Sequence, residues 1–134
     1  AMLPGTDRAS DRFVRASFYT GAVKKTADPV DAVAAAFSII RNASVPLGMQ
    51  PPPGQPNIAS TLWRTVADQK NRVYFFESTR SPNVFWVNLA DVDFAPGAPV
   101  KKLKLANGTE IYAGNVAAKF ETAQPFVFKA ADAK

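Results

Sequence analysis

Two residue types with reactive side chains are missing from this sequence, which has no cysteine and no histidine in 134 residues. Without cysteine the chain has no disulfide framework, no thiolate zinc site and no cysteine nucleophile. Without histidine it has no imidazole to act as a general base. The chain by itself therefore cannot contain a complete nucleophilic or metal-dependent hydrolytic active site. Its compartment stays open, because oxidising and reducing environments both permit a cysteine-free protein.

Other sequence signals are missing as well. No apolar run reaches the roughly 18 to 20 residues that cross a bilayer, and residues 1–5 are too short and uncharged for a signal peptide. We expect no membrane partner. The sequence has no phosphate-binding glycine loop and no metal-ligand spacing, so it predicts no cofactor and no metal. It begins with Ala1 and not with methionine, which indicates a processed start or a piece of a longer protein; we favour the second interpretation.

The charge is modest and dispersed. Sixteen basic and eleven acidic residues give a formal charge of +5, and the basic residues cluster only at residues 24–25 and 101–104. This distribution is typical of a soluble surface and predicts no nucleic-acid partner. With 47% hydrophobic residues, the chain can build one core, so we expect a single domain over residues 1–134.

The clearest local pattern is an apolar stripe at helical spacing in residues 28–42. Its members are Val30, Val33, Ala34, Phe37 and Ile40. Asp28 suits the N-cap, Pro29 the first turn, and Arg41 the negative end of the helix dipole. The sequence therefore predicts an amphipathic helix with both ends specified.

A second, shorter helix is predicted over about residues 10–20. Ser10 or Asp11 would cap it, and Gly21 would stop it. Prolines and glycines then fill residues 46–57, which predicts an extended loop. That loop is either a plain connection or an active-site lid.

From residue 62 the pattern changes to that of strands. Residues 62–67 and 72–78 flank a polar turn at 68–71, and a third apolar run follows at 84–89, so a three-stranded antiparallel meander is predicted. Both faces carry large apolar side chains: Tyr74, Phe75, Phe76, Phe85, Val87 and Leu89. We expect an α+β fold whose sheet packs on both faces, with one layer missing from this chain.

The remaining sequence predicts only peripheral structure. It includes residues 100–105, a turn at residues 107–108, and a short helix over residues 115–121. The eleven carboxylates fall mostly at caps, turns and strand ends. Asp91 and Asp93 are the tightest pair on the β side, and we assign them to the surface or a turn and not to catalysis.

Two arginines are stronger candidates for a functional role than the carboxylates. Arg12 and Arg15 lie three residues apart on the first predicted helix, among apolar neighbours. Either both are structural, or one guanidinium points inward to stabilise an anion or a thiolate. Arginine suits the second role because it stays charged at every physiological pH.

The same segment resembles a known family. Residues 3–5 (Leu-Pro-Gly) followed by residues 12–16 (Arg-Phe-Val-Arg-Ala) resemble the part of penicillin V acylases and choloylglycine (bile salt) hydrolases that carries a catalytic arginine. Further blocks resemble the penicillin V acylase branch at residues 26–29, 37–42, 45–48, 61–68, 76–79 and 81–83. The resemblance covers about residues 3–105.

The resemblance implies an N-terminal-nucleophile hydrolase of linear amides with a four-layer αββα fold. Its nucleophile would be a cysteine at the mature amino terminus, whose α-amino group serves as base. This chain would then be the carboxy-terminal part of such an enzyme, inactive alone. Its partners would be the missing amino-terminal part, a small-molecule amide such as penicillin V or a conjugated bile acid, and further copies in a homotetramer.

Of the family's catalytic residues, the resemblance carries over only the arginine, which corresponds to Arg12. That arginine would sit beside the thiolate and lower the thiol pKa. The family usually has Asp after Leu-Pro-Gly and Ser before the arginine, whereas this chain has Thr6 and Asp11. An aspartate at that position could draw the guanidinium away from the thiolate.

The sequence is also compatible with two other interpretations. One is a stand-alone basic binding module whose aromatic strands stack bases or sugars, although these aromatics alternate with apolar residues as core residues do. The other is a non-catalytic descendant or structural subunit with the same layers. The choice between penicillin V and bile salts is also open.

Overall fold

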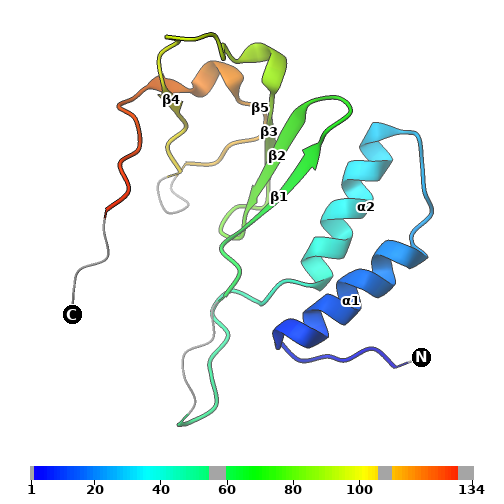
Figure 1. Cartoon of the computed structure of the whole chain (residues 1–134). Helices are drawn as coiled ribbons and strands as arrows, with labels where there is room; N and C mark the ends of the chain where they lie inside the picture. Colours follow the sequence, from blue (N-terminus) through cyan, green and yellow to red (C-terminus); the bar gives the residue numbers. More distant parts are fainter. Residues whose placement is uncertain (1, 55–59, 106–109, 130–134) are drawn as a thin grey trace.

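The computed structural model describes residues 2–54, 60–105 and 110–129, and it shows two helices beside a small mixed sheet (Figure 1). The elements are α1 (Ala9–Ala22), α2 (Pro29–Asn42), β1 (Trp63–Asp68), β2 (Val73–Ser78), β3 (Val84–Asn88), η1 (Leu89–Asp91), β4 (Lys101–Lys102), β5 (Gly114–Asn115), η2 (Ala117–Lys119) and β6 (Glu121–Thr122). The predicted α+β class is confirmed.

Helix α2 begins and ends where the sequence predicts. The Asp28 carboxylate accepts hydrogen bonds from the backbone amides of Val30 at 2.8 Å and Asp31 at 3.1 Å, which satisfies two amides of the first turn. Phe37 is buried at 3% exposure. The predicted stripe is wrong at Val30, which is 75% exposed, and at Ala34, also exposed. The contact with the sheet is narrower than the stripe, so these two edge positions stay in solvent.

Removing this cap should cost a measurable part of the stability. We expect Asp28→Ala to lower the free energy of unfolding by about 1 kcal/mol, because two amides lose their acceptor. Urea denaturation followed by circular dichroism measures it. Asp31→Asn is the control, since the Asp31 carboxylate contributes only its charge near the helix dipole. Equal losses in the two variants would contradict the capping role of Asp28.

Helix α1 is longer than predicted and begins differently. Its N-cap is Arg8, which makes no side-chain capping bond, so the predicted cap at Ser10 or Asp11 is wrong. The Asp11 carboxylate instead accepts hydrogen bonds from the hydroxyls of Thr6 and Ser10. Gly21 lies inside the last turn and does not stop the helix.

The predicted meander is confirmed, and the sheet extends beyond it. Strands β1, β2 and β3 pair antiparallel, with Arg64 opposite Glu77 and Phe75 opposite Trp86. The described strand order is β1-β2-β3-β5, and β5 pairs parallel to β3. Strands β4 and β6 form a separate antiparallel pair. The sequence did not predict β5 because a two-residue strand has no periodicity.

The carboxy-terminal part is less peripheral than predicted. The predicted helix over 115–121 is wrong, because η2 is a single 3₁₀ turn between two short strands. Val116 is only 1% exposed, and its amide donates to the Trp86 carbonyl at 2.9 Å, so this segment packs against β3. The predicted turn at 107–108 lies outside the described residues. Residues 46–54 of the proline-rich loop contain no helix or strand.

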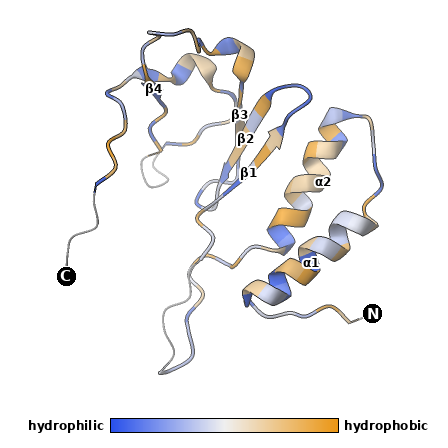
Figure 2. Cartoon of the chain, in the orientation of Figure 1, coloured by the Kyte–Doolittle hydropathy of each residue, from blue (hydrophilic) through white to orange (hydrophobic). Residues whose placement is uncertain are grey.

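One face of the sheet is covered by helix and the other only in part. On the helix face, Phe37 of α2 meets Phe75 edge-on at 6.5 Å, and Phe75 packs on Trp86 at 5.7 Å. On the opposite face, the carboxy-terminal segment around Val116 covers the side of the sheet at β3. Tyr74 and Trp63 on the same face are 42% and 58% exposed. Figure 2 shows hydrophobic residues on the strands, on α2 and in the carboxy-terminal segment.

The total exposed area agrees with this uneven coverage. The chain exposes 10354 Å², whereas a compact monomer of 14.4 kDa exposes about 6,800 Å². The buried apolar side chains among the described residues are Phe37, Val45, Phe85 and Val116. This core is small for the length of the chain, as expected when a further layer normally covers the sheet.

Candidate functional site

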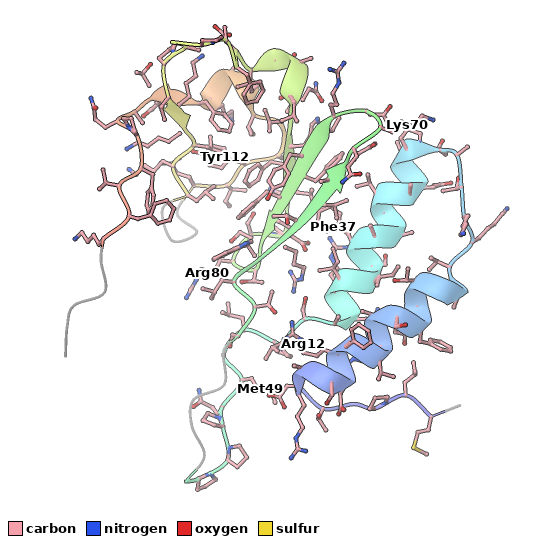
Figure 3. The ribbon with its side chains drawn as sticks, viewed as in Figure 1. Arg12, Phe37, Met49, Lys70, Arg80 and Tyr112 are labelled. Carbon is pink, nitrogen blue, oxygen red and sulfur yellow. The ribbon has the colours of Figure 1, made fainter. Side chains whose placement is uncertain are left out.

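Arg12 lies where the start of α1 meets the end of α2 (Figure 3). Its Nε donates a 2.6 Å hydrogen bond to the carbonyl of Ala43, the C-cap residue of α2. Carbonyls at a helix C-terminus carry partial negative charge, so they bind a guanidinium well. Within the described residues, the two terminal amino groups of Arg12 have no hydrogen-bond partner. The guanidinium is therefore held at one nitrogen and keeps two donor groups for another anion.

Arg15 lies one turn further along α1, and two of its three guanidinium nitrogens bond to backbone carbonyls. Its Nε donates to the carbonyl of Asn42 at 3.1 Å, and its Nη1 donates to the carbonyls of Pro4 and Thr6 at 2.8 Å each. These bonds tie residues 4–6 to the middle of α1 and to the end of α2. Arg15 therefore fits the structural role that the sequence left open for the pair, whereas Arg12 fits both roles.

Asp11 does not draw Arg12 away, although it precedes Arg12 in the sequence. Its carboxylate bonds to Thr6 and Ser10, and the hydrogen bond from Thr6 is the main cause that lowers the pKa of Asp11. The ion pairs among the described residues do not include Asp11 with Arg12. The departure from the family pattern at positions 6 and 11 thus forms a local hydroxyl–carboxylate pair and leaves the Arg12 guanidinium available.

A second polar cluster lies close to the end of α2, and the sequence analysis did not predict it. The Glu77 carboxylate on β2 is buried and accepts from Arg41 of α2 at 2.5 and 3.1 Å and from Arg64 of β1 at 3.0 Å. Arg64 Nε donates to the Ser44 hydroxyl at 2.8 Å. The sequence carried a usable signal, because the hairpin register places Arg64 opposite Glu77.

The other sequence candidates have structural roles. Asp93 accepts from the amide of Ala95 at 2.9 Å, and Asp91 accepts from Asn88 and Asn115, so the assignment of this pair to turns and the surface is confirmed. A hollow of about 460 Å³ lies between the first turns of α2 and the β1–β2 turn. It is about 20 Å from Arg12, at the far end of a 14-residue helix.

The described residues supply few other kinds of site. Neither α1 nor α2 combines the length and apolar character that a membrane crossing requires. In residues 2–54, 60–105 and 110–129, no three acidic side chains gather in a geometry that could hold a metal ion.

Comparisons with known proteins are consistent with one another. The family "linear amide C-N hydrolases, choloylglycine hydrolase family" matches residues 1–111. A penicillin V acylase of Pectobacterium atrosepticum is 53% identical over 95% of this chain, which spans 37% of that protein. The structure of penicillin V acylase from Agrobacterium tumefaciens superposes with a TM-score of 0.87 at 52% identity, over 97% of this chain and 41% of that one. The chain thus spans about two fifths of the length of these relatives.

Proposed function

Because this chain belongs to the choloylglycine hydrolase family of linear amide C–N hydrolases, we propose that it forms the carboxy-terminal part of an amide-cleaving enzyme of the penicillin V acylase type. The high identity over nearly the whole chain supports the assignment. The chain has no cysteine, so a cysteine nucleophile would come from the part of the enzyme that corresponds to the other three fifths of its relatives.

Arg12 is the residue that we assign to the reaction. A single bond to the Ala43 carbonyl fixes its Nε, and its two terminal amino groups, which have no partner among the described residues, would face a thiolate or substrate oxygen. A guanidinium beside a thiol favours the charged thiolate and lowers the thiol pKa, which raises the nucleophile concentration at neutral pH. The chain thereby supplies charge stabilisation and positioning, while the attacking sulfur and its base come from the remainder.

A chimaera tests this proposal. The chain replaces the matching segment of the Pectobacterium acylase, and hydrolysis of penicillin V is measured by the appearance of a free amine. We expect turnover within about tenfold of the parent acylase, a difference of about 1.4 kcal/mol in activation free energy. The isolated chain should show no turnover. A folded chimaera without turnover would instead support the non-catalytic descendant.

The substrate and the assembly are part of the same proposal. Relatives at about 52% identity are named for penicillin V, so we infer that this amide is cleaved in preference to conjugated bile acids. The homotetramer stays a prediction from family resemblance, and the mass of the active chimaera by light scattering tests it. Preferential hydrolysis of a conjugated bile acid by the chimaera would overturn the substrate assignment.

A further inference from the structure

Glu77 is a buried charged residue within an apolar strand, and it is 6% exposed. A carboxylate in such a place loses hydration, which its partners have to replace. Two arginines do so from two different elements: Arg41 comes from α2 and Arg64 from β1. The carboxylate therefore links the helical layer to the sheet at one defined point.

The link reaches the end of α2 at two places. Arg41 lies two residues before Ala43, and its guanidinium bonds directly to Glu77. Ser44 lies one residue after Ala43, and its hydroxyl accepts from Arg64 and donates to the Ile40 carbonyl at 2.7 Å. The Ala43 carbonyl, which accepts from Arg12, thus lies between two residues that the Glu77 cluster holds.

We propose that Glu77 is a positioning residue for the reaction. By anchoring Arg41 and Arg64, it fixes the last turn of α2 against the sheet, and the Ala43 carbonyl of that turn sets the guanidinium of Arg12. The inference rests on the proposed function of Arg12. It goes beyond that function, because Glu77 makes no bond to Arg12 and acts only through the backbone of α2.

A merely structural role for Glu77 makes a different prediction. If the cluster only binds helix to sheet, its loss lowers stability and leaves the chemistry of the nucleophile unchanged. If the cluster positions Arg12, its loss also moves the guanidinium away from the thiolate and raises the thiol pKa. Each unit of that rise makes cysteine alkylation about tenfold slower at pH values below the thiol pKa.

The test is the pH profile of cysteine alkylation by iodoacetamide in the active chimaera. We expect Glu77→Gln to move the acid limb to higher pH, in the same direction as Arg12→Lys, and to lower kcat more than it raises KM. The double variant should move the limb no further than Arg12→Lys alone, because both changes act on one guanidinium. Additive shifts would overturn the proposal.

Two more variants keep the outcomes distinct. Val116→Ala opens the core away from this cluster, so it should lower Tm without moving the limb. Ser44→Ala removes one hydroxyl of the anchor and should give a smaller shift in the direction of Glu77→Gln, which serves if Glu77→Gln does not fold. If the acid limb of the pH profile does not move in Glu77→Gln or Ser44→Ala but moves in Arg12→Lys, only the role of Glu77 is overturned. A limb unmoved by Arg12→Ala, which removes the charge, overturns the proposed function of Arg12.

Discussion

Arg12→Ala in the chimaera is expected to lower kcat/KM for penicillin V by about 10²- to 10³-fold, the loss typical of removing one preorganised group that stabilises charge in an active site. The reason is that different nitrogens of the one guanidinium have different roles. Its Nε bonds to the Ala43 carbonyl, and we propose that the terminal amino groups, which have no partner among the described residues, face the reacting centre. Steady-state hydrolysis across a range of substrate concentrations measures the loss and separates kcat from KM.

Arg15→Ala is the matched control, since both arginines lie on α1 and both bond to the end of α2. Arg15 spends Nε and Nη1 on backbone carbonyls, including those of Pro4 and Thr6. We expect its loss to lower Tm, with kcat/KM kept within about tenfold of the unsubstituted chimaera. Equal losses of kcat/KM in Arg12→Ala and Arg15→Ala would mean that both residues act through folding alone, and the catalytic assignment of Arg12 would fail.

Arg12→Lys refines the same prediction. Lysine keeps the charge but has a single nitrogen, which cannot both bond to the Ala43 carbonyl and reach a second group with the geometry of a guanidinium. We therefore expect a loss of kcat/KM between those of Arg12→Ala and the unsubstituted chimaera. Full activity in Arg12→Lys would show that a positive charge is sufficient and that the bond to Ala43 has no functional consequence.

Helix α2 shows which parts of the fold follow from local sequence. Its N-terminus depends on Asp28 and Pro29, which act within one turn, so the predicted start agrees with the observed one. The hairpin is equally local, since a polar turn joins two apolar runs. Helix α1 lacks a capping side chain, and its first residue was accordingly misplaced.

The parts that could not be predicted depend on packing between distant segments. Val116 is buried because its segment runs beside β3, and a two-residue strand with a single 3₁₀ turn leaves no periodic pattern. The same holds for the site. The spacing of Arg12 and Arg15 indicates a shared helix face, but only the crossing of α1 over the end of α2 shows that Ala43 and Asn42 receive them.

A substitution on the partly covered face of the sheet should have the second large effect, and its size should depend on whether the rest of the enzyme is present. Tyr74 lies on the central strand β2, 42% exposed, on the face opposite α2. In the isolated chain Tyr74→Lys should change the free energy of unfolding by about 0.5 kcal/mol or less, as surface substitutions do. In the chimaera we expect a loss of about 3 kcal/mol or more, because a covering layer would bury the aromatic ring and then the new charge.

The difference between the two contexts isolates the effect of a covering layer, since a substitution that harmed the sheet itself would destabilise the isolated chain and the chimaera alike. Thermal unfolding of Tyr74→Lys in the isolated chain and in the chimaera measures it. Gln69→Lys adds the same charge in the exposed β1–β2 turn and should be nearly neutral in both. A tolerated Tyr74→Lys in the chimaera would mean that this face stays in solvent. The excess exposed area would then reflect an open fold and not a surface that the remaining layers cover.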